Sequence, residues 1–188
     1  LTMQTFADAN LDEQVLRGVY THGFETPSNI QKQTLTALIE GRDVIAQAQS
    51  GTGKTGAFAI AIAQRIVTGS VRKAIILSPT RELAHQTVVV CDAVAQYAEA
   101  VKTCICVGGR PVNENKRQIE QGATVMVGTP GRIKDIVTNR VTWLGAEVDM
   151  LIVDEADQFL VEDGSPGFFG RLSRDSASPS QGRADCFV

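Results

Sequence analysis

The chain has 188 residues, of which 43% are hydrophobic and 21% are charged, a composition typical of a soluble globular domain large enough to bury a core. Its formal net charge of −3 argues against a general electrostatic attachment to nucleic acid and leaves a local phosphate site as the alternative. No apolar run reaches the roughly 18 residues of a membrane-spanning helix, so no membrane partner is expected.

Two helices are predicted near the N-terminus. The first covers residues 11–22, with Asn10 as its N-cap and Glu13 three residues later, a variant of the capping box. The second runs over residues 28–40 and ends at Gly41, a residue suited to the left-handed conformation that follows many helices. Because the first residues lack both Met at position 1 and a signal-peptide pattern, we expect a fragment or a processed chain.

Short β-branched runs then alternate with helical stretches. Strands are predicted at 44–45, 74–77, 101–107, 125–127 and 150–153, with helices near 54–68, 81–98, 112–121 and 131–139. Strands that are almost wholly apolar are covered on both faces, and strand–helix alternation makes them parallel. We therefore predict an α/β fold, an open and mostly parallel sheet with helices on both faces, which binds ligands at the carboxyl ends of its strands.

Four cysteines stand at positions 91, 104, 106 and 186, without the paired spacing of a zinc site. Cys104 and Cys106 alternate within an apolar run and are expected on one face of a strand. We interpret the cysteines as buried and reduced, which is typical of an intracellular compartment, here the cytoplasm.

A phosphate-binding loop is predicted at residues 48–55, which read AQSGTGKT between a predicted strand and a predicted helix. Glycines let successive backbone N–H groups point inward at the start of a helix, where they can hold phosphate. Lys54 can reach the β and γ phosphates of a nucleotide, and the Thr55 hydroxyl can join the shell of a Mg²⁺ ion. The nucleotide-binding residues expected here are Gln49, Ser50, Gly51, Thr52, Gly53, Lys54 and Thr55. The alternative is a glycine-rich connector that happens to contain Lys-Thr.

An acidic cluster, Asp154-Glu155-Ala156-Asp157, follows the apolar run 151–153. A carboxylate at the end of a buried strand beside the loop can hold Mg²⁺, the role we expect for Asp154. Glu155 can then orient and deprotonate an attacking water. Lys54, Asp154 and Glu155 are thus the predicted catalytic residues, and the alternative is a solvated acidic turn.

These residues, with others in the same order along the chain, resemble the DEAD-box RNA helicase family over about residues 6–160. The matching segments are Phe6 with GFETPSNIQ at 23–31, the loop beginning at Ala48, PTRELA at 79–84, GG at 108–109, TPGR at 129–132 and DEAD at 154–157. Residues 16–31 and 43–55 are most similar to translation-initiation members of the family. The resemblance implies a RecA-like ATPase domain at residues 43–163, preceded by an adenine-recognition segment at 1–42.

Adenine recognition would fall to Phe6, Phe24 and Gln31 by this resemblance. An amide both donates and accepts, so the Gln31 side chain can read the N6 and N7 edge of adenine. Phe6 can stack on or shelter the base, although a plain hydrophobic anchor is the alternative.

The resemblance also implies RNA as a partner, together with translation-initiation or ribonucleoprotein subunits. The residues implied on an RNA-binding face are Pro79, Thr80, Arg81, Gly108, Gly109, Thr129, Pro130, Gly131 and Arg132. Contacts of this kind with the RNA backbone carry no sequence preference. For Arg81 the alternative is an internal ion pair beside Glu82.

After Asp157 the resemblance fails, since the only candidate for the family's Ser-Ala-Thr motif is Ser176-Ala177-Ser178, which follows no apolar strand. We expect a domain truncated at its C-terminal end, an irregular tail at 164–188 and no second helicase domain. The predicted function is ATP-dependent RNA unwinding with ATP and Mg²⁺. The alternatives are an ATP-gated RNA clamp in a ribonucleoprotein complex and a P-loop NTPase that acts on DNA or protein.

Overall fold

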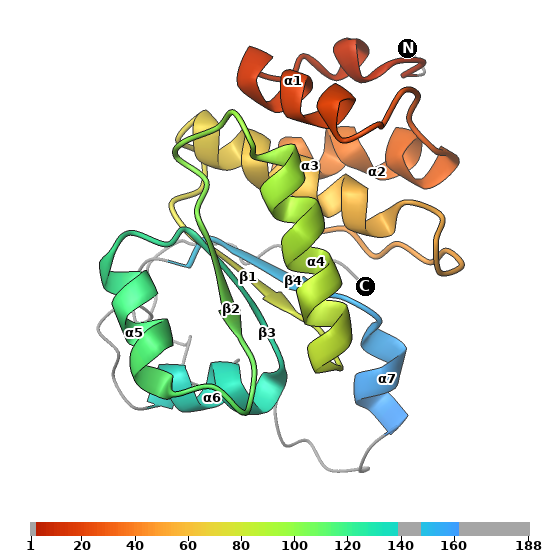
Figure 1. Cartoon of the computed structure of the whole chain (residues 1–188). Helices are drawn as coiled ribbons and strands as arrows, with labels where there is room; N and C mark the ends of the chain where they lie inside the picture. The colour runs from red at the N-terminus through yellow and green to blue at the C-terminus, as the bar shows by residue number, and fades with distance from the viewer. Residues whose placement is uncertain (1–2, 139–147, 162–188) are drawn as a thin grey trace.

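The central sheet of this computed structural model, which describes residues 3–138 and 148–161, has four parallel strands in the order β2-β3-β1-β4. The strands are β1 (Ala74–Leu77), β2 (Thr103–Cys106), β3 (Val125–Gly128) and β4 (Met150–Val153). β1 lies between β3 and β4, with Leu77 opposite Gly128 on one side and Val153 on the other. Four of the five predicted strands are therefore confirmed, as is the parallel sheet (Figure 1).

The strand predicted at Val44 and Ile45 is wrong. Residues 42–49 form no regular element, and the Ile45 side chain is 84% exposed. A strand is stabilised by hydrogen bonds to a neighbouring strand. The sheet ends at β4, and within the described residues the backbone of residues 43–48 forms no such bond to a strand.

Helices cover both faces of the sheet, as predicted (Figure 1). Their bounds are α1 (Glu13–Thr21), α2 (Asn29–Ile39), α3 (Lys54–Val67), α4 (Arg81–Val94), α5 (Val112–Glu120), α6 (Pro130–Thr138) and α7 (Ala156–Val161), with a 3-10 turn η1 at Phe6–Ala9. Helices α3 and α4 pack on one face, with α1 and α2 outside them, while α5 and α6 pack on the other. None of the helices in the described ranges is both long and apolar enough to cross a bilayer.

The helix ends follow local side-chain chemistry. The predicted N-cap Asn10 is wrong, because Asn10 has a left-handed backbone (φ 50°) and Asp12 caps α1 by accepting from the Gln14 N–H at 2.9 Å. Ser28 and Gln31 form a full capping box at the start of α2. Gly41 takes the left-handed conformation expected after that helix.

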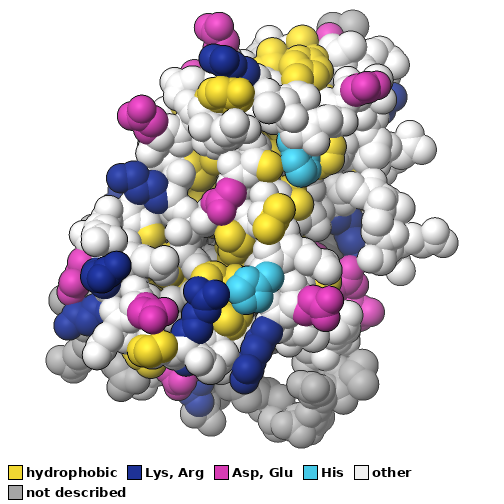
Figure 2. Space-filling view, in the orientation of Figure 1, with side chains coloured by type: hydrophobic (Ala, Val, Ile, Leu, Met, Phe, Trp, Pro, Cys, Tyr) yellow, Lys and Arg dark blue, Asp and Glu magenta, His cyan; other side chains and the backbone are white. Residues whose placement is uncertain are grey.

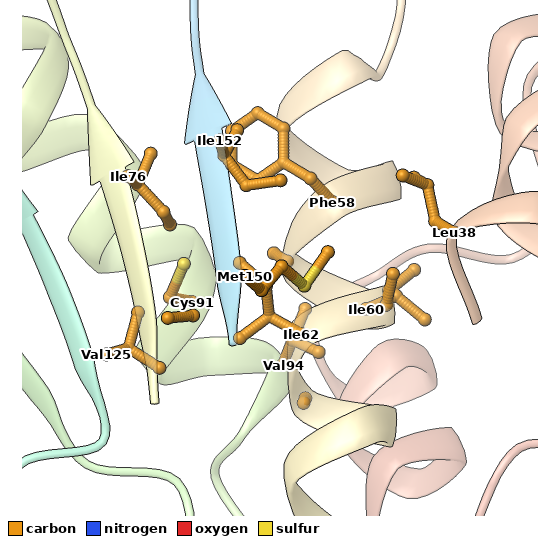
Figure 3. Packing of buried hydrophobic residues seen from close by; sticks show 14 of the residues in the cluster. Leu38, Phe58, Ile60, Ile62, Ile76, Cys91, Val94, Val125, Met150 and Ile152 are labelled. Atoms are coloured by element: carbon orange, nitrogen blue, oxygen red, sulfur yellow. The ribbon is translucent and has the colours of Figure 1, made fainter. Parts of the chain in front are cut away.

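Alternate residues of the strands enter two separate cores. Ile76 and Ile152 meet Phe58 of α3 in the core on the α3 and α4 face, which Figure 3 shows from close by. Leu77 and Val153 enter the opposite core, formed with α5 and α6. Because the two central strands, β1 and β3, are buried on both faces, the carboxyl ends of the strands form a rigid edge on which a site can be built.

Gly18 fixes the contact between α1 and α4, since a Cβ at this position would overlap the backbone carbonyl of Val94. We expect Gly18→Ala to lower the free energy of unfolding by about 1–3 kcal/mol, the usual range for overpacking. Gly131→Ala is the matched control, because a Cβ there meets nothing within 4 Å. Urea denaturation of both variants checks the prediction, and equal stability of Gly18→Ala and wild type would contradict it.

Candidate functional site

The loops after the parallel strands meet at one edge of the sheet. Ser78 follows β1, Thr129 follows β3 and Asp154 follows β4, and the register places the ends of these three strands side by side. Backbone bonds continue beyond the strands, from Ser78 N to Gly128 O and from Asp154 N to Leu77 O, both 2.9 Å. The predicted catalytic and RNA-binding segments therefore share one edge.

The phosphate-binding loop leads directly into α3. Gly51 (φ 80°) and Gly53 (φ 102°) have left-handed backbones, and Gly53 precedes the first residue of the helix, Lys54. The Thr52 hydroxyl donates to the Gln49 carbonyl at 2.7 Å and tightens the turn. Gln49, Ser50 and Gly51 are exposed. An exposed loop at a free helix N-terminus has the geometry that phosphate binding requires.

Gln31 joins the adenine-recognition segment to this loop. Its side-chain oxygen accepts from the Ser28 N–H at 2.8 Å, and its amide nitrogen donates to the Gly53 carbonyl at 3.1 Å. The side chain is buried, and a Cβ on Gly53 or Gly56 would come within 3.0 Å of its nitrogen. In this structure the amide therefore contacts the protein on both sides, and its contact with adenine stays a prediction.

Phe6 is fully buried against two other rings. It lies 6.3 Å from Phe24 in a stacked arrangement and 6.4 Å from Tyr20 edge to face, measured between ring centroids. In this arrangement Phe6 anchors η1 to α1 and to the segment before α2. Contact between Phe6 and a base remains a prediction.

An open depression of about 370 Å³ lies beside the loop and the start of α2. It is lined by Ser28, Asn29, Ile30, Gln33, Gln47, Ala48 and Thr52. Sequence reasoning did not predict Asn29 and Gln33 here, because neither residue belongs to a phosphate-loop pattern. The depression thus borders both the chain neighbours of Gln31 at the start of α2 and the predicted phosphate-binding loop.

The three predicted catalytic residues lie together at the end of β4. The Lys54 ammonium is 3.5 Å from a Glu155 carboxylate oxygen, and both side chains are mostly buried. Glu155 has a left-handed backbone (φ 53°), a strained conformation for a residue with a side chain and one that is enriched at functional sites. The Glu155 side chain is thus mostly buried, and its role as the base stays a prediction.

Asp154 is 6% exposed. Burial, helped by the neighbouring Glu155 charge and opposed by Lys54, raises the pKa of its carboxyl to about 6. A cation at this position would relieve the cost of a buried carboxylate, and Mg²⁺ prefers such oxygen donors. The buried Asp154 carboxylate therefore suits Mg²⁺, and Thr55 as a second ligand stays a prediction.

Arg81 lies against the glycine pair that follows β2. Its guanidinium nitrogens would come within 3.0 Å of a Cβ on Gly108 and 3.2 Å of one on Gly109. Among the described residues it forms no ion pair with Glu82, the alternative left open by the sequence. Pro79 and Thr80 precede it, and the Thr80 hydroxyl caps α4 by accepting from the Leu83 N–H at 3.2 Å.

The TPGR segment begins a helix, as predicted. Helix α6 starts at Pro130, and Gly131 is exposed at its first turn. Arg132 donates to the Asn115 side-chain oxygen at 3.1 Å and to the Arg110 carbonyl at 2.8 Å. In Figure 2, dark-blue Lys and Arg side chains, interspersed with acidic ones, gather in the lower half of the view, where α4 begins in Figure 1.

Sequence reasoning missed two buried polar residues at this edge. Asn115 lies on α5 and is 1% exposed, and Ser78 is fully buried with no hydrogen-bond partner for its hydroxyl in the described part of the chain. Asn115 could have been found as an uncharged polar residue on the apolar face of its helix, four residues before Ile119. Ser78 gave no signal beyond its place after an apolar strand.

Three comparisons with known proteins agree on the family. The family model described as DEAD/DEAH box helicase matches residues 28–180. Eukaryotic initiation factor 4A of Drosophila melanogaster is 49% identical over 157 residues, which are 82% of this chain and 38% of that protein. ATP-dependent RNA helicase eIF4A of Chaetomium globosum is 42% identical over 160 residues, or 85% and 40%. The chain thus spans about two fifths of the length of these curated relatives.

Solved structures give the same result. A DEAD box protein from the hyperthermophile Methanococcus jannaschii matches all of this chain and 50% of its own, with 30% identity and a TM-score of 0.84. S. cerevisiae Dbp5 bound to RNA and ADP BeF3 matches 98% of this chain and 46% of its own, with 30% identity and a TM-score of 0.80. On its sequence, its fold and the order of its motifs, the chain belongs to the DEAD/DEAH box helicase family.

Proposed function

We propose that the chain is the ATP-binding domain of an ATP-dependent RNA helicase and that one edge of its sheet holds both the nucleotide and the RNA. The observation that carries the proposal is the meeting of Lys54 and Glu155 at that edge, 3.5 Å apart, beside the buried Asp154. A structural ion pair alone would not require a phosphate-binding loop, a strained Glu155 backbone and a buried second carboxylate at the same point.

In the nucleotide-binding part of the site, Lys54 exchanges one anionic partner, Glu155, for another, the bound phosphate. A bound phosphate competes with Glu155 for Lys54, because both are anions within reach of one ammonium group. Once Lys54 turns to the phosphate, Glu155 is free to accept a proton from the water that attacks the terminal phosphoryl group. The ground-state pair therefore keeps the base engaged until nucleotide enters.

Asp154 and Thr55 would hold Mg²⁺, which neutralises charge on the phosphates when bound. Gln31 would recognise adenine by turning both ends of its amide, from Ser28 and from Gly53, to the N6 and N7 edge of the base. Because the Gln31 amide is bonded to the Gly53 carbonyl, a movement of this amide toward adenine directly affects the residue that precedes Lys54.

The RNA-binding part of the site contacts the sugar-phosphate backbone of the RNA. The residues proposed to contact RNA lie in the loops after β1, β2 and β3 and in the first turns of the helices α4 and α6; they are Pro79, Thr80, Arg81, Gly108, Gly109, Thr129, Pro130, Gly131 and Arg132. Neither Arg81 nor Arg132 is neutralised by a carboxylate within residues 3–138 and 148–161. Two uncompensated guanidinium groups beside exposed glycines suit phosphate, and such contacts are independent of base sequence.

The finer assignment is a helicase of the translation-initiation type, acting in the cytoplasm with other initiation or ribonucleoprotein subunits. The identity to initiation factor 4A proteins supports this assignment. The unwinding activity belongs to the longer protein that such relatives represent.

Adenine selectivity tests the nucleotide assignment. By calorimetry, ADP should bind much more tightly than GDP, and Gln31→Ala should weaken ADP binding by about 1–3 kcal/mol through loss of a two-point contact. Gln14→Ala, at an exposed position of α1, is the matched control. Equal affinity for ADP and GDP would exclude the adenine-recognition role.

A further inference from the structure

Asn115 is a buried amide with both ends bonded. Its nitrogen donates to the Ile105 carbonyl of β2 at 2.6 Å, and its oxygen accepts from the Arg132 guanidinium at 3.1 Å. The side chain is 1% exposed. A buried amide of this kind is costly unless satisfied, and these two bonds, with a weaker one from the same nitrogen to the Cys104 sulfur at 3.5 Å, fix its position and rotamer.

The second arm of Arg132 reaches a different segment. Its other terminal nitrogen donates to the Arg110 carbonyl at 2.8 Å, directly after Gly108 and Gly109. Arg132 therefore links α5, α6 and the glycine turn through two neutral acceptors. A carboxylate in place of Asn115 would hold the guanidinium equally well but would also neutralise it.

The glycine turn is enclosed by two guanidinium groups. Arg81 lies against Gly108 and Gly109 from the β1 side, and Arg132 holds the following residue, Arg110, from the α6 side. Two positive charges thus lie beside one short stretch of backbone, and that of Arg132 is held in place by its two hydrogen bonds. A planar guanidinium held at fixed atoms loses less entropy on binding phosphate than a freely rotating one.

We infer that Asn115 is a positioning residue for RNA binding, which holds Arg132 and the glycine turn in register for a phosphate of the RNA backbone while leaving the Arg132 charge available. The inference rests on the proposed RNA-binding function. Asn115 itself does not touch RNA and acts through Arg132.

A double-mutant cycle on RNA affinity tests this inference. Fluorescence anisotropy with a labelled single-stranded oligouridine at low salt compares wild type, Asn115→Ala, Arg132→Ala and the double variant. Asn115→Ala should weaken RNA binding by about 5- to 30-fold, a loss of the size expected when a charge-assisted contact is misplaced. Because Asn115 acts through Arg132, the double variant should bind no more weakly than Arg132→Ala alone. Asn113→Ala, exposed on the same helix, is the matched control and should bind like wild type.

Arg132→Lys provides a second test, in which the buried Asn115 amide is intact. Lysine keeps the charge but cannot bond Asn115 and the Arg110 carbonyl in the planar geometry of a guanidinium. This variant should bind RNA about as weakly as Asn115→Ala. ADP affinity, measured in parallel, should be unchanged in every variant, since the nucleotide site lies on other loops.

Additive losses in the cycle, or wild-type affinity in Asn115→Ala, would overturn the positioning role, as would wild-type affinity in Arg132→Lys. If Asn115→Ala loses ADP binding through misfolding, wild-type RNA affinity in Arg132→Lys still overturns the positioning role. Failure of the wild-type chain to bind RNA would instead refute the proposed function, so the two failures are distinguishable.

Discussion

Lys54→Ala should lower the affinity of the chain for ADP by about 2–4 kcal/mol, in the range for truncation of one partner in a desolvated charge pair. Lys54 stands at the first position of α3, next to a loop shaped for phosphate, and its side chain is only 13% exposed. Its removal eliminates the one ammonium group within the loop. Calorimetric titration with Mg²⁺ and ADP measures the loss.

Glu155→Gln is the matched variant for this prediction, because it removes the same ion pair from the other side. It should bind ADP at least as well as wild type, since Lys54 is then released to contact phosphate. An exposed lysine, Lys134, provides a second control as Lys134→Ala. Loss of ADP affinity in Glu155→Gln equal to that in Lys54→Ala would mean that the pair stabilises the loop and that Lys54 has no direct phosphate contact.

Asp154→Asn should stabilise the chain at neutral pH. Burial raises the pKa of Asp154 from its ordinary value near 3.8 to about 6, so between these two values the folded chain binds more protons than the unfolded chain. The free energy of unfolding is therefore highest when the pH is below 3.8, the pKa of Asp154 in the unfolded chain. It falls as the pH rises from there through about 6, the pKa in the folded chain. At about pH 7.5 the ionised carboxylate costs about 2–3 kcal/mol, which the amide removes.

Urea denaturation of wild type and Asp154→Asn at about pH 4 and about pH 7.5 measures the effect. The gain should be present at the higher pH and nearly absent at the lower one. Asp157→Asn, at an exposed position three residues later, controls for the general effect of removing a carboxylate. A gain for Asp154→Asn that is equal at both pH values would contradict the burial argument. A buried carboxylate that lowers the free energy of unfolding is typical of a functional site, where the protein is less stable than its fold would allow.

The sheet could be predicted from sequence because its strands are buried on both faces. Runs such as Ala74–Leu77 and Met150–Val153 contain no polar residue, and helices flank each of them. Val44 and Ile45 have the same local character but form no strand, because a strand depends on its neighbour. That dependence is not visible in two residues of sequence.

Catalytic and ligand-binding residues can be predicted from sequence where the chemistry requires a particular residue type. A phosphate loop needs glycines and lysine, and a metal site needs a carboxylate, so the sequence alone predicts these roles for Lys54, Asp154 and Glu155, and the structure adds that Lys54 and Glu155 are close together. Asn115 could not be identified, since its role depends on the distance to Arg132 and on the carbonyl of Ile105. The bond from Gln31 to the Gly53 carbonyl could not be predicted for the same reason, because Gly53 lies 22 residues away.

The most direct test of the central claim is a residue-resolved NMR titration of the chain, first with Mg²⁺ and ADP and then with single-stranded RNA. ADP should shift the amide signals of residues 28–33, 48–55 and 154–155, around the loop and the end of β4. RNA should shift those of 79–81, 108–110 and 129–132, on the neighbouring loops of the same edge. Shifts in two such adjoining sets would agree with one edge that holds both ligands. RNA-induced shifts confined to other parts of the chain, or ADP-induced shifts that avoid the loop, would contradict it.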